Sequence, residues 1–475
     1  MNTFFIVALV LYLAVLMGIA IFSQRKVHNE EDFLIGGRSF NLWVTTLCLF
    51  ATWFGAGTLI AATDEVAEAG LRVTALEPVG AGFCLILAGI FFAKPLWDLK
   101  ITTYSDFFRQ KFGKTAESLS VFINIPIYVG WVAVQYMVLA NILHIFFPSA
   151  SISLLIFLVC FVTMLLTLMG GLWSVSLTDS FQLVLIILGL VYLLFKVLSL
   201  SEYGPLELLS FVPEEQKVFI PTDKAKSLFG WVSLFSIAAI GNLTGQDLAQ
   251  RIFSANKPST AQKGCIIAGV TYLIIGCIPV FLGLTAKLTM GQVDGPIIPM
   301  LIKKFLDPVS GTILSITIFS AVVSTITAAL LAPASLLSHN FLVQKFPNRS
   351  KLQISRLSVV FIALISLLTA LAGENVYSLL ENSYAIGLVA FFVPVVMGLF
   401  TRFHDELACL VTIVLSTAIW CLEFIVGGDF PYALFATLIG FPIYFATYYL
   451  KKKWSSFKIR NQDPQPTEAS AAESI

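Results

Sequence analysis

The sequence predicts an all-α membrane protein with about 13 transmembrane helices, ten of them arranged as two inverted five-helix repeats. The first observation is composition: 57% of the 475 residues are hydrophobic and only 12% are charged, with a mean hydropathy of +0.88. Soluble proteins carry about 25% charged residues. The second is a succession of apolar runs of spanning length. The third is a pair of glycine-containing interruptions at matching positions of two runs, which is typical of inverted-repeat transporters.

The apolar runs follow one another along most of the chain. The first, residues 1–22, lacks a basic segment at its start and precedes many further spans, so we interpret it as a membrane helix and not a cleaved signal. The other runs lie near residues 40–62, 74–97, 119–147, 152–169, 175–200, 228–247, 264–286, 308–337, 354–372, 376–400, 406–426 and 432–449.

These runs and the polar segments between them predict six regions. An extra helix and an inner linker precede the first repeat, a polar outer loop separates the two repeats, and two extra helices and a polar tail follow the second. The regions are residues 1–38, 39–200 (first repeat), 201–227 (outer loop), 228–400 (second repeat), 401–450 and 451–475 (tail).

Lys and Arg placement predicts the orientation, because these residues gather in cytoplasmic segments. With the N-terminus outside, most of the 29 Lys and Arg residues fall in segments on the inner side, including residues 98–118, 338–356 and the tail. We therefore expect a multi-pass protein of the plasma (inner) membrane with an outer N-terminus and a cytoplasmic C-terminus.

The interruptions lie at residues 51–57 and 241–245, where each predicted repeat begins. Glycine is unfavourable inside a helix by about 1 kcal/mol. Backbone freed at the membrane midplane is tolerated where it lines a polar cavity. We therefore predict broken first and sixth core helices around a central site. The alternative for residues 51–57 alone is a small-residue patch that lets two helices pack closely.

Several motifs resemble the sodium/solute symporter family between about residues 31 and 400. EDFLIGGRS at residues 31–39 resembles the linker before the first core helix, and GGLWSVSLTDSFQ at 170–182 resembles the family signature around the fifth. FSAVVST at 319–325 resembles the eighth core helix of proline and sugar members. ATWFG at 51–55 and FFAKP at 91–95 are similar to the choline-transporting branch. The resemblance implies a LeuT-type fold.

The resemblance also implies a sodium site, and helix geometry agrees with it. Ala321, Ser324 and Thr325 stand at i, i+3 and i+4 and share one helix face. One carbonyl and two hydroxyls there would face the carbonyls of Ala51 and Phe54 in the broken helix. The alternative is that the hydroxyls bind carbonyls one turn back in their own helix.

Two acidic residues within spans are further candidates. The resemblance implies that Asp179 supports sodium, and the alternative is a carboxylate that caps a helix beginning near Val175. Glu381, near the start of the tenth core helix, has no counterpart in the motifs and lies either in the outer vestibule or at a solvated helix end. Charged residues inside membrane spans are usually functional.

The predicted solute site is aromatic. Trp53 lies in the broken first core helix, and Trp131 lies one turn from Gln135 in the third. The resemblance implies an aromatic cage, which suits a quaternary ammonium group, but Gly245 stands where a third cage tryptophan is expected. Packing of both rings between helices is the alternative. The predicted solute residues are Trp53, Gly55, Trp131, Gln135, Gly245 and Gln246.

We therefore predict a sodium-coupled symporter that imports a small organic solute, an amino acid such as proline or a quaternary amine such as choline, by alternating access. The alternatives are proton coupling through Asp179 or Glu381 and a facilitative carrier of the same fold. The sequence shows neither a phosphate-binding loop nor a nucleophile or metal constellation, so we expect no enzyme and no cofactor. The expected partners are sodium, the solute and the lipid bilayer, and no nucleic acid.

Overall fold

The structure is a computed structural model that describes residues 3–291, 295–372, 385–427 and 430–462. Within these ranges the long elements are all helices, and the β structure is limited to an isolated parallel bridge between Phe40 and Ala255. Ten helices in the described residues are long and apolar enough to cross a membrane, or 11 if one bent helix pair is counted as a span. The predicted all-α membrane fold is confirmed.

The first repeat begins with a broken helix and ends with a very long one. Its elements are α3 (Leu42–Trp53), η2 (Gly57–Ala61), α4 (Ala62–Ala69), η3 (Leu71–Ala75), α5 (Val79–Leu87), η4 (Ala88–Phe92), α6 (Ala93–Asp98), α7 (Tyr104–Lys111), α8 (Lys114–Phe146) and α9 (Ile152–Leu200). The short helix α2 (Glu30–Ile35) and the turn η1 (Gly36–Arg38) precede them.

The helix α9 is kinked at a single glycine. Gly171 has φ 50° and ψ −133°, which is not helical, and a Cβ atom there would lie 2.2 Å from the Phe33 carbonyl oxygen. Only glycine fits this position. The predicted spans 152–169 and 175–200 lie on either side of the kink, so α9 contains both.

The second repeat also begins with a broken helix. Its elements are α12 (Ala225–Ala239), η5 (Gly241–Thr244), α13 (Gln246–Ser254), α14 (Pro258–Met290), α15 (Ile297–Phe305), α16 (Pro308–Ser335), η6 (Leu336–Leu342), α17 (Val343–Lys345), α18 (Lys351–Ala372), η7 (Gly387–Phe392) and α20 (Val393–Phe400). The predicted break at 241–245 is confirmed: α12 ends before it, and Gly245 is extended (φ −69°, ψ 135°) where α13 begins.

Three long helices of the described residues lie outside the two predicted repeats: α1 (Thr3–Gln24), α21 (Glu406–Val426) and α22 (Tyr432–Gln462). The predicted count of about 13 spans is not confirmed by the helices that pass the length and composition test. The difference has three sources. The bent pair at the start of the first repeat is left out of the count of ten. The 49-residue helix α9 is counted once, although the non-helical Gly171 divides it into two helical segments. The predicted span 376–400 begins among residues 373–384, which lie outside the described residues.

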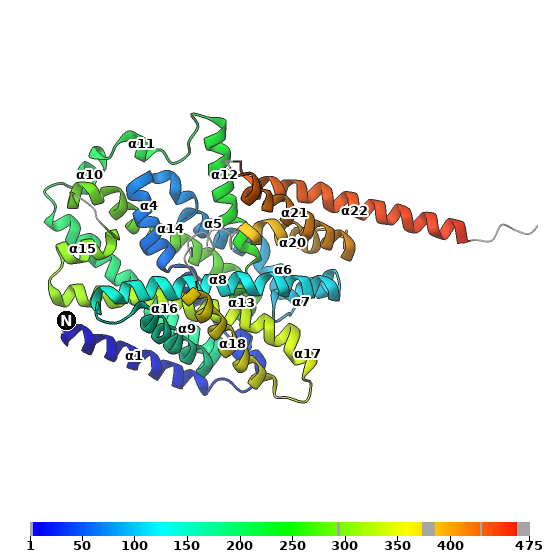
Figure 1. Ribbon diagram of the computed structural model, residues 1–475, viewed down its shortest axis with the longest axis horizontal. Helices are drawn as coiled ribbons and strands as arrows, with labels where there is room; N and C mark the ends of the chain where they lie inside the picture. The colour runs from blue at the N-terminus through cyan, green and yellow to red at the C-terminus, as the bar shows by residue number, and fades with distance from the viewer. Residues whose placement is uncertain (1–2, 292–294, 373–384, 428–429, 463–475) are drawn as a thin grey trace, which may run out of the picture.

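Several of the long helices run in nearly the same direction. Figure 1 shows α1, α8 and α22 nearly parallel, with α10 (Pro205–Phe211), α11 (Glu214–Lys217) and α15 at one end of the bundle. The helices α7 and α17 lie toward the other end, from which α22 projects. Segments that the sequence places on opposite sides of the membrane therefore gather at opposite ends.

The helix α16 forms the centre of the bundle. In the span Pro308–Lys345, which begins with α16, 94% of the residues in the most apolar stretch are buried. The helix packs against α8, α9 and α18. Its start is well defined, because Asp307 accepts hydrogen bonds from the N–H groups of Val309 and Ser310, and Pro308 occupies the first turn. A helix surrounded on all sides by protein can carry polar side chains toward a buried site.

Candidate functional site

The first core helix is interrupted where it meets α16. The helix α3 ends at Trp53, and the segment that begins at Gly57 is bent from it by 58°. The N–H of Gly55 binds the Trp53 carbonyl at 2.8 Å and not the carbonyl of Ala51, its usual helical partner. The break therefore releases the Ala51 carbonyl oxygen toward α16, as the sequence predicts.

The polar face of α16 lies directly against this break. The Ser324 hydroxyl oxygen lies 3.3 Å from the Ala51 carbonyl oxygen. A Cβ atom on Gly55 would lie 2.1 Å from the Thr325 hydroxyl oxygen, so glycine is required for the close approach of the two helices. The residues Ala51, Phe54, Ala321, Ser324 and Thr325 are all buried.

The two hydroxyls of the predicted sodium site behave differently. Thr325 donates to the Ala321 carbonyl at 3.1 Å, the bond to its own helix that the sequence left as an alternative. Its oxygen keeps lone pairs for a cation, because a hydroxyl has one donor and two acceptor positions. The described bonds of Ser324 instead leave α16 for α3 and α9.

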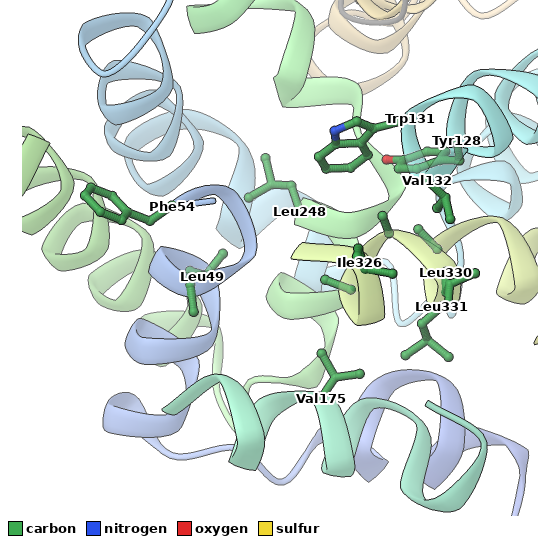
Figure 2. Packing of buried hydrophobic residues seen from close by; sticks show 14 of the residues in the cluster. Leu49, Phe54, Tyr128, Trp131, Val132, Val175, Leu248, Ile326, Leu330 and Leu331 are labelled. Atoms are coloured by element: carbon green, nitrogen blue, oxygen red, sulfur yellow. The ribbon is translucent and has the colours of Figure 1, made fainter. Parts of the chain in front are cut away.

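Phe54 can contribute its main chain to this site and not its ring. Its ring packs edge-on against Tyr272 with centroids 5.1 Å apart, and Figure 2 shows it directed away from Tyr128 and Trp131. Because the ring packs against Tyr272 of α14, only the main-chain carbonyl of Phe54 is available as a ligand for a cation.

Asp179 adds a carboxylate to the same place. It is fully buried and accepts from Ser324 Oγ at 2.5 Å and from Cys48 Sγ at 3.7 Å. These partners are side chains on α16 and α3, and the residue lies two turns beyond the kink of α9, so helix capping does not describe it. The structure brings Asp179 together with Ser324 and, through Ser324, with the Ala51 carbonyl.

A cavity of about 60 Å³ lies between the two broken helices and α8. Three of the predicted solute residues line it: Trp53, Trp131 and Gly245. The remaining lining comes from α8, the two interruptions and neighbouring segments, namely Glu77, Asn124, Ile127, Tyr128, Gly241, Asn242, Thr244, Asp247 and Gly387.

The cavity contains a carboxylate held by aromatic side chains. Trp53 Nε1 donates to Asp247 Oδ2 at 2.7 Å, and the Tyr128 hydroxyl donates to Oδ1 at 2.5 Å. The rings of Tyr128 and Trp131 are 5.8 Å apart, and Figure 2 shows both projecting from α8 on one side. Three aromatic rings and one carboxyl group therefore line one small space.

Glu77 supplies a second acidic group to the cavity wall. Its Oε2 accepts from the Thr58 hydroxyl and from the Tyr272 hydroxyl, both at 2.9 Å. The Tyr272 hydroxyl oxygen also lies 3.2 Å from the Trp53 carbonyl oxygen. This cluster ties the segment after the first break to α14 and to the backbone beside the solute cavity.

The other predicted solute residues lie elsewhere. Gly55 packs against Thr325, and Gln135 lines a separate cavity one turn along α8 from Trp131. Gln246 is buried between helices: it accepts from the Tyr104 N–H at 2.7 Å and donates to the Ser335 hydroxyl at 2.9 Å. Sequence reasoning missed Glu77, Tyr128 and Asp247 as cavity residues.

The end of the bundle that contains α7 and α17 is closed by polar contacts. His339 contacts Glu30 and Asp106 at 3.4 and 3.3 Å, and Asn340 donates to Asp106 and Glu117 at 2.8 and 2.9 Å. Burial alone would raise the pKa of the Asp106 carboxyl, but hydrogen bonds from His339 and from the N–H groups of residues 102 and 103 hold this pKa below its usual value.

The polar face of α16, the paired helix breaks and the cavity between them are the features of a membrane transporter of the LeuT type. The fold matches solved transporters along most of the chain. A Na⁺-coupled sialic acid symporter in a substrate-bound outward-open state has a TM-score of 0.82, with 19% identity, and the match covers 94% of this chain and 98% of the other. A nucleobase-cation-symport-1 family transporter in a closed conformation has a TM-score of 0.60, with 15% identity and coverage of 91% and 96%.

The chain belongs to the sodium:solute symporter family, whose sequence pattern matches residues 33–415. The high affinity choline transporter 1 of Homo sapiens is 24% identical over 470 residues, which cover 93% of this chain and 79% of that protein. The sodium/myo-inositol cotransporter 2 of Bos taurus is 26% identical over 317 residues, covering 59% and 45%. The protein is thus a multi-pass, sodium-coupled importer of a small organic solute and not an enzyme.

Proposed function

We propose that the imported solute is a small organic cation of the quaternary ammonium class, such as choline. The observation that carries the proposal is the carboxylate of Asp247, which lines the cavity between Trp53 and Tyr128. Both of its oxygens accept one hydrogen bond, and the group keeps further acceptor positions and its negative charge. Glu77 adds a second acidic side chain to the same wall.

The aromatic rings support the same class of solute. A quaternary ammonium group makes no hydrogen bonds, and each ring face attracts it by about 0.5–2 kcal/mol. The third ring of the cavity comes from Tyr128 on α8, while Gly245 leaves the position on the sixth core helix open. The similarity to the human choline transporter agrees with this proposal.

A zwitterionic amino acid such as proline fits the cavity less well. Its carboxylate would share about 60 Å³ with Asp247 and Glu77, and like charges at close range repel strongly where little water screens them. A neutral polyol would bring no positive charge to the carboxylate of Asp247. Between the solutes that the sequence suggests, the cavity therefore favours the amine.

The sodium ion is proposed to bind at the break beside α16. Its ligands are the carbonyls of Ala51, Phe54 and Ala321 and the hydroxyls of Ser324 and Thr325, with Asp179 behind them. The support is that Ser324 already joins Ala51 and Asp179. A cage of oxygens suits a hard cation. Sodium as the coupling ion is then sufficient, with no cofactor and no proton relay. Glu381, the other candidate for proton coupling, lies outside the described residues.

The orientation is part of the proposal. The positive charges of the sequence favour an outer N-terminus and a cytoplasmic C-terminus in the plasma membrane. The support from the fold is that α10 and α11 gather at one end of the bundle and α7 and α17 toward the other (Figure 1). The polar closure around His339 and Asp106 would then lie on the cytoplasmic side.

The test is competition for uptake. Proteoliposomes with an inward sodium gradient should take up labelled choline, with inhibition by other quaternary amines and not by proline or myo-inositol. Asp247→Asn keeps the shape of the side chain and removes its charge, so the choline concentration for half-maximal uptake should rise by roughly tenfold or more.

The matched control is Asp98→Asn, which also removes one carboxylate, here from an exposed residue that pairs with Lys94. This variant should transport choline like the wild type. Uptake of proline or a polyol that is unaffected by an excess of choline would contradict the proposed solute class.

A further inference from the structure

The first helix of the chain, α1, carries one polar side chain into the bundle. Between Phe4 and Phe22 its sequence is apolar except for Tyr12, which is only 6% exposed. The helix packs along α9 and α16, the two helices that carry Asp179 and Ser324 (Figure 1). Polar groups inside membrane spans are rare and usually functional. The Tyr12 hydroxyl is therefore a candidate functional group.

The Tyr12 hydroxyl binds the last residue of the motif GGLWSVSLTDSFQ. Gln182 Nε2 donates to the Tyr12 hydroxyl oxygen at 2.7 Å. Gln182 is fully buried, and its Oε1 has no hydrogen-bond partner among the described residues. Neither the sodium site nor the solute cavity uses this glutamine. Within the part of the chain that the structure describes, its amide is therefore held by Tyr12.

Gln182 stands one turn from Asp179 on α9. Residues three apart on a helix are neighbours on its surface, about 4.5 Å apart along the axis. On α16, Ser320 stands one turn from Ser324 and lies close to Tyr12. The contact between α9 and α16 therefore has two successive polar levels. Asp179 and Ser324 form the first level, and Gln182, Ser320 and Tyr12 form the second.

The second level is completed by a helix that lies outside both repeats. The helix α9 ends the first repeat and α16 belongs to the second, so their contact joins the two repeats. The bond between Ser324 and Asp179 measures 2.5 Å and would be lost if α9 moved by about 1 Å. A hydrogen bond from α1 one turn away restrains the same face of α9.

From this geometry we infer that Tyr12 and Gln182 are positioning residues of the sodium site. Through Gln182, the Tyr12 hydroxyl keeps Asp179 in contact with Ser324, and α1 thereby contributes to ion binding. This role rests on the proposed sodium site. It is independent of the solute class, because none of these residues lines the solute cavity.

The experiment measures sodium binding directly. Labelled sodium is titrated at equilibrium onto the purified full-length protein in the absence of solute. Tyr12→Phe removes the hydroxyl and keeps the ring. We expect the sodium affinity to fall about threefold to tenfold, as for the loss of one buried hydrogen bond. The choline concentration for half-maximal uptake at saturating sodium should stay close to that of the wild type.

A double variant separates positioning from stability. Tyr12→Phe leaves the Gln182 amide unpaired, which by itself destabilises the fold. Tyr12→Phe combined with Gln182→Leu removes both partners, and such a paired apolar replacement is nearly neutral for stability. We expect the melting temperature to recover in the double variant while the sodium affinity stays low. Recovery of both quantities would overturn the inference, because the unpaired amide alone would then explain the single variant.

Tyr192→Phe is the matched control. The Tyr192 hydroxyl also joins α9 to α16, since it lies 3.0 Å from the Ser310 hydroxyl oxygen. This contact is about 20 Å from Asp179 along the helix axis. The variant should bind sodium like the wild type. Equal weakening by Tyr192→Phe would overturn the inference, because any contact between the two helices would then have the same effect.

Ser324→Ala distinguishes the role of α1 from the sodium site on which it rests. If Ser324→Ala weakens sodium binding and Tyr12→Phe does not, the sodium site stands and the role of α1 is overturned. If neither variant weakens sodium binding, the proposed sodium site is wrong, and the role of α1 falls with it.

Discussion

The Ser324 hydroxyl joins three helices through one oxygen atom. It donates to Asp179 on α9 and reaches the Ala51 carbonyl at the end of α3. A cation at this place would take the oxygen as a ligand and would be balanced by the carboxylate behind it. The sodium proposal therefore depends on Ser324 more than on Thr325, whose hydroxyl also satisfies its own helix.

Replacement of Ser324 tests this role. Ser324→Ala removes one oxygen from a buried site, which is unfavourable by about 1–3 kcal/mol. The sodium concentration for half-maximal uptake should therefore rise roughly tenfold or more. Thr327→Ala is the control, because Thr327 is buried on the same helix and donates to the Ser324 carbonyl. If the sodium dependence of both variants equals that of the wild type, Ser324 is a packing residue and not a sodium ligand.

Single residues were predictable where a motif or helix periodicity placed them. The i, i+3, i+4 spacing of Ala321, Ser324 and Thr325 is visible in the sequence. Glu77 and Asp247 were not found as cavity residues, because each lies at the start of a helical segment, where an acid usually serves the helix dipole. Their position beside the cavity depends on how distant helices pack.

At the scale of elements, the break in the first core helix acts through its contact with α16. The chain is bent by 58° there, and Gly55 allows α3 and α16 to approach until a Cβ atom would lie 2.1 Å from Thr325 Oγ1. The close approach is a condition for sodium ligands to come from both helices. The break and the neighbouring helix therefore form one unit.

Gly55→Ala should disrupt this unit. The added methyl group would push Thr325 away from the break, and we expect sodium-dependent uptake to fall at least tenfold, since overpacking of a buried contact is unfavourable by about 1–3 kcal/mol. Gly230→Ala is the control, because a Cβ atom there meets nothing within 4 Å. Normal sodium dependence of Gly55→Ala, measured by uptake in proteoliposomes, would contradict the account.

The two main breaks were predictable because glycines interrupt otherwise apolar runs. The short helices α7, α10 and α11 were not predicted as elements, since each is a brief amphipathic or polar segment between spans. The kink of α9 lies between two predicted spans, yet the sequence alone did not identify Gly171 as the residue that carries it. Glycine is required there because of a tertiary contact: the Phe33 carbonyl packs so close that a side chain would not fit.

At the scale of the whole molecule, the two ends of the bundle differ in their contacts. One end carries α10, α11 and α15, and the other is closed by hydrogen bonds around Asn340 and Asp106. The distribution of Lys and Arg predicts which end is cytoplasmic. In the fold, the segments predicted to lie inside and outside are found at opposite ends. The exact number of spans could not be predicted, because a kinked helix and a short apolar helix such as Gly387–Phe400 do not divide cleanly by length.

Single cysteines test the orientation. In a background without the seven native cysteines, Ser210→Cys and Ser350→Cys place exposed thiols on segments proposed to lie outside and inside. We expect an impermeant thiol reagent to label only Ser210→Cys on intact cells, and both variants after permeabilisation. Labelling of Ser350→Cys alone on intact cells would reverse the orientation.

Sodium coupling is the central claim, and one measurement tests it most directly. Proteoliposomes are loaded without sodium, and labelled choline uptake is followed after sodium is added outside with an imposed inside-negative potential. A tenfold sodium gradient supplies about 1.4 kcal/mol, and 100 mV supplies about 2.3 kcal/mol per charge. We predict that choline transiently accumulates well above the level that the same potential produces without external sodium, and that Ser324→Ala greatly reduces this sodium-dependent difference. Accumulation that is equal with and without sodium at the same potential, or that follows a pH gradient in its place, would contradict the account.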